Sequence, residues 1–343
     1  MILYATNPAA CTTVRRITRF VLLALIGWGS AACSSDVGQR AGYLPGGDGT
    51  KLYYRFLGEG PDTVVVVHGG PGAGMNTILP NLRPLAKDFT LLFYDQRGGG
   101  RSDLPADTSL LDVRYFVEDL ESVRRFLGID RLRVIAHSFG ALLVSEYLST
   151  YPDHVDRAVF IGATGPRRAS AAEAARKATL SSERTEQARR QGEVLSQLLQ
   201  GEAEDPIAAC SEYEELTRQL TAARGDTTQW DGTSCAAPPE AVRYYFRYTA
   251  QITPRSLGDW DFTTGLEHVQ ALLLVIHGDK DEDLLTAQHE WAAALPNARI
   301  LVVPGSGRAP IADRPEMTFP ALTVFLRGEW PEGATIVSRS MID

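Results

Sequence analysis

The sequence has few cysteines and histidines, which are the usual zinc ligands, and it lacks the excess of positive charge that binds nucleic acid. Its 343 residues include four cysteines and six histidines, and no group of them has the spacing of a zinc site. The net charge is -8 and there is no basic tract, which excludes nucleic acid as a partner because such binding needs a cationic surface. With 44% hydrophobic and 22% charged residues, the composition is that of a globular protein. We therefore expect a folded protein that binds no metal, cofactor or nucleic acid.

Residues 1–32 have the order of parts found in a secretory signal peptide. Three arginines precede a short apolar run, which is too short to span a bilayer, and small residues follow it. Residues 29–33, Gly-Ser-Ala-Ala-Cys, also resemble a bacterial lipoprotein signal in which the cysteine carries lipid. The alternative is a plain cleaved signal with Cys33 incidental. We expect export to the bacterial periplasm or cell envelope, a lipid on Cys33 as the sole membrane contact, and a polar linker over 33–48.

Two cysteines, Cys210 and Cys235, remain in the body of the chain. Both lie in a polar, loop-rich segment, and an oxidising compartment allows them to pair. We therefore expect a disulfide between them, with two buried thiols as the alternative.

Strand and helix patterns alternate along most of the chain. Six apolar, β-branched runs predict buried parallel strands, at 63–67, 90–94, 132–136, 158–162, 271–276 and 299–303. Amphipathic helices are predicted between and after them, at 113–127, 141–149, 285–295 and 314–326. This alternation predicts an α/β fold, with a mostly parallel sheet flanked by helices on both faces.

Residues 165–260 interrupt that alternation. They are rich in Ala, Glu, Arg and Gln, and three helices are predicted in them, at 171–199, 210–222 and 240–248. Because this stretch stands between two core strands, we expect it to fold over the sheet as an inserted helical cap. The core is then built from 49–164 and 261–328, and 329–343 forms a C-terminal tail.

The sharpest chemical signal is Ala136-His-Ser138-Phe-Gly140, which joins a predicted strand to a predicted helix. A serine on such a tight turn needs small residues two positions to either side, and the usual pattern is Gly-x-Ser-x-Gly. The turn presents the hydroxyl at a helix N-terminus, where negative charge is favoured. We expect Ser138 to be a nucleophile by position, and a helix N-cap serine is the alternative.

A glycine-rich turn, His68-Gly-Gly-Pro-Gly72, follows the strand 63–67. Glycines let backbone N–H groups turn toward a bound oxygen, so this turn predicts an oxyanion hole with Gly70 as one donor. The second donor is the N–H of Phe139, directly after the nucleophile. An ordinary turn is the alternative, and a phosphate loop is excluded because no Gly-Lys-Ser/Thr follows.

Together, these motifs resemble the proline iminopeptidase group of the α/β hydrolases. His68–Gly72, then Asp95-Gln-Arg-Gly-Gly-Gly-Arg-Ser102, then the Ser138 turn match that group in order and spacing. The resemblance covers roughly 45–164 and 258–326. It implies an α/β hydrolase fold with a cap, and a serine hydrolase that acts on a peptide, amide or ester bond of a small-molecule or peptide substrate.

The resemblance also implies an acid and a substrate ligand. The triad order in this fold is serine, acid, histidine, and Asp281 matches the acid position after the strand 271–276. Asp279, Asp283 or a merely solvated loop are the alternatives. In related aminopeptidases a glutamate at the position of Glu282 helps to hold the substrate's α-ammonium group. A second glutamate would be expected where this chain has Ala250 and Gln251.

The histidine of the triad is missing. The family reads Gly-x-Gly-His-x-Pro after the last strand, and this chain reads Gly305-Ser-Gly-Arg308-Ala-Pro310. Arginine stays protonated, so it cannot accept the serine proton, and a serine without a base is a weak nucleophile. We expect Arg308 to form a salt bridge with Asp281 in place of the acid–base relay. No other histidine stands where a base is needed: those considered are His68, His137, His154, His268, His277 and His289.

Three hypotheses follow. The first is a serine hydrolase that uses Ser138, Asp281 and the oxyanion donors despite Arg308. The second is a catalytically impaired pseudoenzyme, a binding or scaffold protein in which Arg308 favours an anionic ligand. The third is a lineage-specific change at position 308 in an otherwise ordinary enzyme.

Overall fold

The computed structural model describes residues 40–172, 185–223 and 229–338. In that part of the chain, eight strands form one sheet in the order β1-β2-β4-β3-β5-β6-β7-β8. The β1–β2 and β2–β4 pairings are antiparallel and all others are parallel. The strands are β1 (Ala41–Pro45), β2 (Lys51–Leu57), β3 (Thr63–Val67), β4 (Thr90–Tyr94), β5 (Leu132–His137), β6 (Val155–Ile161), β7 (Leu272–Gly278) and β8 (Ala298–Val303). The expected signal peptide and Cys33 lie outside the described residues.

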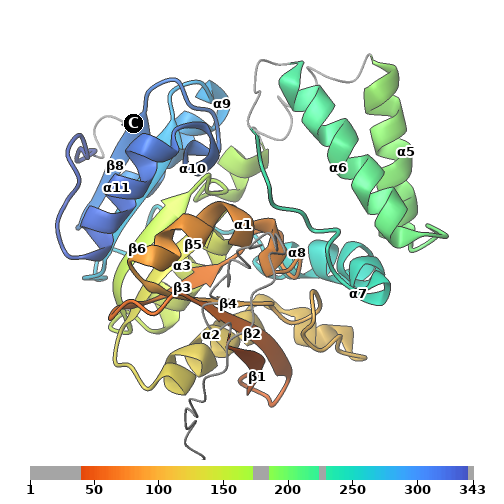
Figure 1. The fold of residues 1–343 in the computed structure, drawn as a ribbon, viewed down its shortest axis with the longest axis horizontal. Helices are drawn as coiled ribbons and strands as arrows, with labels where there is room; N and C mark the ends of the chain where they lie inside the picture. The colour runs from red at the N-terminus through yellow and green to blue at the C-terminus, as the bar shows by residue number, and fades with distance from the viewer. Residues whose placement is uncertain (1–39, 173–184, 224–228, 339–343) are drawn as a thin grey trace, which may run out of the picture. The chain divides into compact units, whose positions relative to one another are not determined.

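Each of the six predicted strands is present, and the mostly parallel sheet is confirmed (Figure 1). Their apolar runs are uninterrupted because both faces of the sheet are covered. In β3, Val65 and Val67 pack on one face while Val64 and Val66 pack on the other. All four side chains are buried, so the run gives no alternation of polar and apolar residues.

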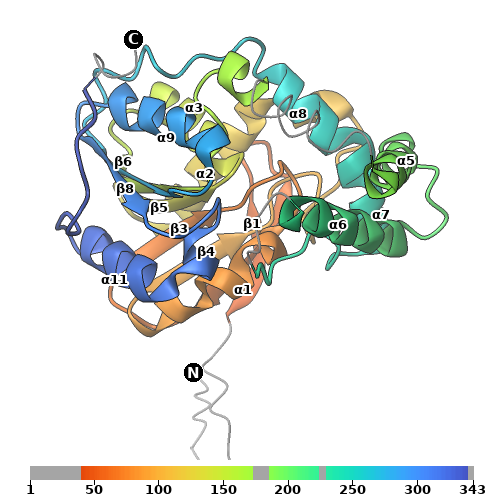
Figure 2. The same cartoon turned by 90° about the horizontal axis from the view of Figure 1, so that it is seen from above.

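Helices form the outer layers. One face carries α2 (Val113–Leu127), α3 (Gly140–Thr150) and α9 (Glu282–Ala294), and the other carries α1 (Leu79–Leu82) and α11 (Pro315–Leu326) (Figure 2). Short elements complete the core: η1 (Met75–Thr77), η2 (Arg83–Lys87), η3 (Thr108–Leu111) and α10 (Pro310–Asp313). No helix in the described residues is long and apolar enough to cross a membrane.

The predicted helix over 113–127 is confirmed as α2, and both of its ends lie where the sequence predicts them. Asp112 caps it by accepting a hydrogen bond from the N–H of Arg114 at 3.1 Å. Gly128 ends it in the left-handed conformation with φ 65°, which a glycine adopts at little cost. Its apolar side, with Phe116 and Leu120, is buried against the sheet.

The expected linker over 33–48 is corrected by the structure. Residues Ala41–Pro45 of that segment form β1, an edge strand paired with β2. Leu44 is buried while its neighbours in β1 are exposed or half-buried, so a single apolar side chain anchors the strand to the core. The edge position explains why the strand lacks the long apolar run of the central strands.

The insertion between β6 and β7 forms helices α5 (Glu186–Gln200), α6 (Pro206–Ala222), α7 (Pro239–Tyr244), η4 (Tyr245–Thr249) and α8 (Ala250–Ser256). The α5 and α6 helices stand side by side, joined by a 2.7 Å hydrogen bond from Gln191 to Thr217 (Figure 1). The expected disulfide between Cys210 and Cys235 is confirmed. It links α6 to the segment that leads into α7.

The helices α7 to α8 dock on the loops at the carboxyl ends of the core strands. Tyr244 Oη donates to the carbonyl of Pro105 at 2.5 Å, and Thr249 Oγ1 donates to that of Gly98 at 2.8 Å. Thr253 Oγ1 donates to the carbonyl of Leu111 at 2.8 Å. The cap therefore places η4 directly beside the glycine-rich loops that follow β3 and β4.

Candidate active site

Ser138 sits on the turn between β5 and α3. Its φ is 54°, and no other non-glycine residue in the described ranges has a positive φ. Such strain persists where the surrounding structure enforces it, typically at functional sites. The crowding is real: a β carbon on Gly140 would lie 2.5 Å from the carbonyl oxygen of Val67, and one on Gly69 would lie 2.7 Å from Ser138 Cβ. The small residues of the motif are therefore a steric requirement of the turn.

The glycine-rich turn His68–Gly72, called the oxyanion turn here because it carries the predicted donor Gly70, is held in shape by the loop after β4. The Gln96 side chain accepts the N–H of Gly72 at 3.1 Å and donates to the carbonyl of His68 at 3.0 Å. Asp95 accepts the N–H of Met75 at 2.6 Å. The motif 95–102 thus acts as a scaffold for the turn 68–72, which explains why both occur together.

Gly70 and Phe139 are the predicted oxyanion donors. Gly70 has φ +50°, a conformation that glycine adopts readily, and Phe139 is the residue that precedes α3. Within the described residues, neither N–H donates to a protein acceptor, whereas the neighbouring Ser138 N–H is bonded to Ile161 at 3.2 Å. Both N–H groups are therefore available to a ligand oxygen.

Asp281 lies at the start of α9, after β7. Its Oδ2 is 3.3 Å from His277 Nε2. Burial opposes ionisation of this carboxyl, but His277 and the positive charge of Arg308 outweigh it and lower the pKa of Asp281. The carboxylate is therefore ionised at neutral pH, as an acid that orients a base would be.

Arg308, which we predict to stand at the position of the base, contacts Ser138. Its Nη2 lies 3.2 Å from Ser138 Oγ, and its Nε and Nη2 lie 3.4 Å from the carbonyl oxygen of Gly162. The charge of Arg308 is one of the causes that lower the pKa of Asp281, and the expected salt bridge between the two residues stays a prediction. Because a guanidinium only donates, the hydroxyl of Ser138 accepts this bond and no proton can pass to Arg308.

The two histidines nearest in sequence to the motifs are poor bases. His68 is fully buried, Nε2 accepts the N–H of Gln96 at 3.2 Å, and Nδ1 lies 2.9 Å from the carbonyl of Gly69. Burial lowers its pKa to about 4. Burial and the charge of Arg308 lower the pKa of His137 to about 3, and its ring stacks on Trp230 of the cap at 5.0 Å. Both are neutral at physiological pH and hold little affinity for a proton.

The low pKa of His68 gives a testable pH dependence. The folded state binds this proton less well than the unfolded state, so the stabilisation is complete above pH 6.5 and is lost as the pH falls toward 4. Lowering the pH from 7 to 4.5 is expected to reduce the free energy of unfolding by about 2–3 kcal/mol on account of His68. Urea denaturation at the two pH values measures it. The drop should be smaller in His68→Gln and unchanged in His268→Gln, an exposed control; an equal drop in all three contradicts the assignment.

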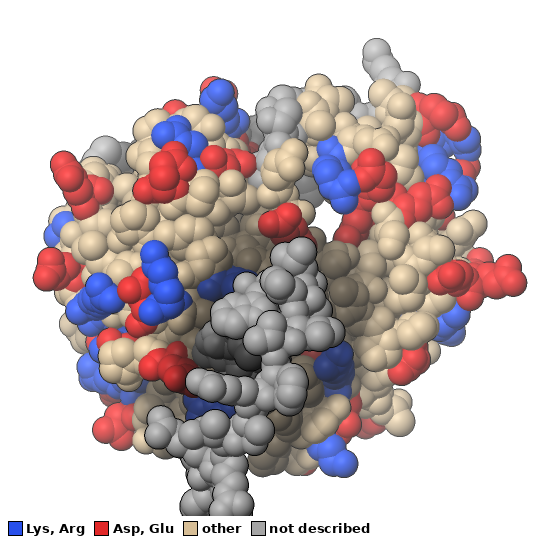
Figure 3. All heavy atoms as spheres, in the orientation of Figure 1, with Lys and Arg blue, Asp and Glu red and all other residues tan. Residues whose placement is uncertain are grey.

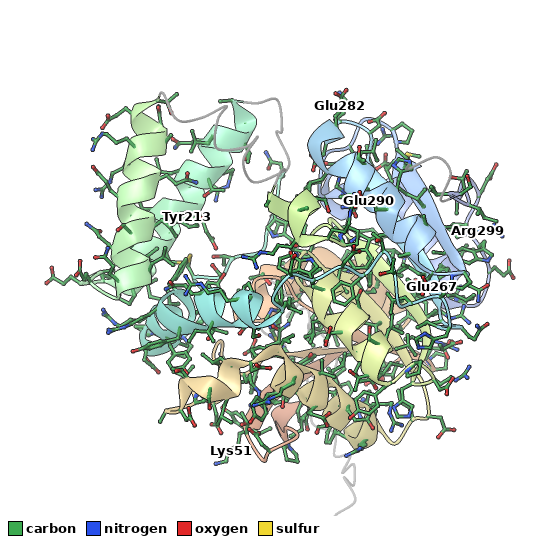
Figure 4. The ribbon with its side chains drawn as sticks, turned by 180° about the vertical axis from the view of Figure 1, so that it is seen from behind. Lys51, Tyr213, Glu267, Glu282, Glu290 and Arg299 are labelled. Carbon is green, nitrogen blue, oxygen red and sulfur yellow. A yellow bond between two sulfur atoms is a disulfide. The ribbon has the colours of Figure 1, made fainter. Side chains whose placement is uncertain are left out.

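The positions considered as ligands of a substrate ammonium group, Glu282 and Gln251, do not point to a shared site. Glu282 is exposed and points away from the molecule at the start of α9 (Figure 4). Gln251 Nε2 donates to backbone carbonyls of the cap, to Arg247 at 2.9 Å and to Phe246 at 3.1 Å. The structure does not bring Glu282 to Ser138, and its role as an ammonium ligand stays a prediction.

The cap adds residues that the sequence did not single out. Trp230 donates from Nε1 to the carbonyl of Thr77 at 2.9 Å and covers His137. The Tyr245 hydroxyl lies against the backbone of Gly70, since a β carbon there would be 2.8 Å from Tyr245 Oη. On the visible face the surface is hollowed between the α5–α6 pair and the core, and charges of both signs are interspersed around it (Figure 3).

Clusters of potential metal ligands are few in the described part of the chain. One group of three has ligand atoms within 4.8 Å of one another, Cys210, Glu214 and Cys235. Its two sulfurs form the disulfide, and Glu214 accepts a hydrogen bond from the N–H of Ser234 at 2.8 Å. In this state the group cannot act as a metal site, because a cysteine binds a metal ion through its thiolate and a disulfide has none.

The sheet order and the strand–turn–helix at Ser138 agree with the similarity of this chain to known proteins. A family model described as the alpha/beta hydrolase fold matches residues 62–315. The chain belongs to the α/β hydrolase fold family. Within this family its curated relatives include a proline iminopeptidase of Heyndrickxia coagulans, 38% identical over 120 residues, which are 35% of this chain and 41% of the relative. Another, from Xylella fastidiosa, is 34% identical over 116 residues, 34% of this chain and 37% of the relative.

This chain therefore matches about two fifths of the length of each of these curated relatives. Solved structures are similar over a longer range. A proline iminopeptidase of Mycobacterium smegmatis aligns over 84% of this chain and 98% of its own, with 21% identity and a TM-score of 0.59. An esterase from a Rhodococcus species aligns over 84% and 98%, with 22% identity and a TM-score of 0.56. At this level of identity the structures establish the fold.

Proposed function

We propose that this protein is a proline iminopeptidase-like α/β hydrolase whose site binds a ligand over Ser138 without hydrolysing it rapidly. One observation carries the proposal: the Arg308 guanidinium lies 3.2 Å from Ser138 Oγ, and the sequence motif predicts the general base at position 308. A positioned base is worth about 10²- to 10⁴-fold in rate. With a permanent cation there, the serine proton has no acceptor.

The rest of the site favours binding. The N–H groups of Gly70 and Phe139 can hold a carbonyl or carboxylate oxygen, and Ser138 adds a hydroxyl. Oxyanion donors and binding alone leave some acceleration in serine hydrolases that lack a triad member. The protein is therefore a binding protein with residual reactivity.

A serine hydrolase that cleaves a peptide, amide or ester bond through Ser138 is the second candidate. The strained φ of 54° at Ser138 and the lowered pKa of Asp281 favour it, because both belong to the catalytic arrangement of this fold. The charge of Arg308 would stabilise a serine alkoxide, but the proton would have to pass to solvent. Turnover by this route would be slow.

We also propose that the protein is exported and anchored by a lipid on Cys33. Support comes from the order of parts in residues 1–32 and from the disulfide between Cys210 and Cys235, since such bonds persist in oxidising compartments. Small-molecule or peptide ligands then come from the cell envelope.

Turnover of p-nitrophenyl butyrate and of proline p-nitroanilide tests the proposed function. We expect kcat/KM of the wild type to exceed that of Ser138→Ala by less than about tenfold, because the serine lacks its base. A ratio above about 10³ with either substrate would establish the second candidate instead.

A further inference from the structure

A tyrosine of the cap reaches the oxyanion turn. Tyr245 begins η4, a π-helical turn, and its hydroxyl lies against Gly70. Turns of this kind are rare and occur frequently at functional sites. Burial raises the pKa of Tyr245 well above its usual value, so the phenol remains a proton donor at all physiological pH values. In the described ranges, no hydrogen bond joins its hydroxyl to a protein group.

The hydrogen-bond donors flank Ser138 on two sides. The strand β5 lies between β3 and β6 in the sheet. The turn with Gly70 follows β3 on one side, and Tyr245 lies on that turn. On the other side, Arg308 reaches Ser138 across the carbonyl of Gly162, directly after β6. A group that sits over the serine therefore meets donors from opposite directions.

We propose that this site takes a carboxylate, with one oxygen between Gly70, Phe139 and Tyr245 and the other at Arg308 and Ser138. The inference rests on the proposed binding function and names its ligand class. A carboxylate is planar and offers two acceptor oxygens, which matches donors on two sides of one point. A neutral amide offers one acceptor oxygen and would leave a donor side unmatched.

The charges at the site agree with this ligand. Arg308 is the cation within hydrogen-bond distance of Ser138, and guanidinium groups bind carboxylates well. The charge of Arg308 also lowers the pKa of Asp281, and the repulsion between the Asp281 carboxylate and a bound carboxylate limits the affinity. The neutral His137 adds no charge. The preference for an anion therefore depends on Arg308 and should disappear with it.

Isothermal titration calorimetry with matched ligand pairs tests the proposal. The probes are acetate with acetamide, phenylacetate with phenylacetamide, and inorganic phosphate. We expect a carboxylate to bind at least about tenfold tighter than its amide, as a charged hydrogen-bond pair allows. Arg308→Gln should abolish that preference, and Tyr245→Phe should weaken carboxylate binding about three- to tenfold.

Two control variants separate the site from general effects. Tyr248→Phe removes a hydroxyl one turn further along the cap helix, and Arg299→Gln removes a surface charge on β8, on the side away from the cap residue Tyr213 (Figure 4). Neither should change carboxylate binding. The proposal is overturned if neither carboxylate binds tighter than its amide, if the preference survives Arg308→Gln, or if phosphate binds tighter than both. An unchanged affinity in Tyr245→Phe removes Tyr245 from the site.

The outcome is independent of the turnover assay. If the wild type hydrolyses esters rapidly but binds carboxylates through Arg308, the proposed function fails and the carboxylate site stands. If the wild type is inert and prefers no carboxylate, the proposed function stands and this inference fails.

Discussion

Replacing Arg308 by histidine is expected to raise the rate at which a fluorophosphonate labels Ser138 by about 10²- to 10⁴-fold, the usual contribution of a general base. The strained turn at Ser138, the N–H groups of Gly70 and Phe139, unbonded within the described residues, and an ionised Asp281 are already in place. The serine therefore lacks one component, a group that takes its proton. Labelling rates measured by intact-protein mass spectrometry above pH 7, where the new imidazole is neutral, give the comparison.

A second substitution distinguishes a gained base from a removed cation. Arg308→Gln takes away the positive charge and the donation to Ser138 but provides no base, so its labelling rate should stay near that of the wild type. Equal gains in Arg308→His and Arg308→Gln would show that the arginine merely blocks the serine. No gain in a folded Arg308→His would contradict the placement of position 308 in the triad.

Asp119→Ala is expected to lower the free energy of unfolding by about 3–5 kcal/mol. Asp119 and Arg97 are both fully buried and are joined by hydrogen bonds of 2.7 Å and 2.6 Å, with Asp48 as a second partner of Arg97 at 3.0 Å. Removing Asp119 leaves the buried guanidinium with the carboxylate of Asp48, which is partly exposed, and the carbonyl of Leu110 at 3.2 Å. Urea denaturation followed by circular dichroism measures the loss.

An exposed ion pair of the cap is the matched control. Arg190 and Glu212 join α5 to α6 at 2.6 Å, and both side chains are exposed. Glu212→Ala should therefore cost under about 1 kcal/mol. If Asp119→Ala cost no more than Glu212→Ala, the buried pair would not anchor the 95–102 loop as the structure implies.

The core of the fold was predictable because the chemistry there is local. Central strands such as β3 are apolar without interruption, and the helix over 113–127 carries both its end signals, Asp112 and Gly128. The first strand was not predictable. In β1 a single side chain, Leu44, is buried, so its sequence has no apolar run that would predict a strand.

Some residues of the site were likewise predictable from the sequence, and others were not. Ser138, Gly70 and Arg308 stand in contiguous motifs, where the spacing itself constrains the backbone. Tyr245 belongs to the cap, whose sequence matches the family only loosely, and its place beside Gly70 depends on how η4 docks. The contact of Arg308 with Ser138 likewise depends on the three-dimensional fold, because the two residues are 170 positions apart.

The most direct test of the central claim is the labelling of the wild-type protein itself. A fluorophosphonate in excess, followed by intact mass and peptide mapping, reports whether Ser138 is an activated nucleophile. Because Arg308 donates to Ser138 Oγ and cannot take its proton, we predict that labelling is no faster than about tenfold above that of Ser138→Ala. Stoichiometric modification of Ser138 within minutes, as an activated serine gives, would contradict the account.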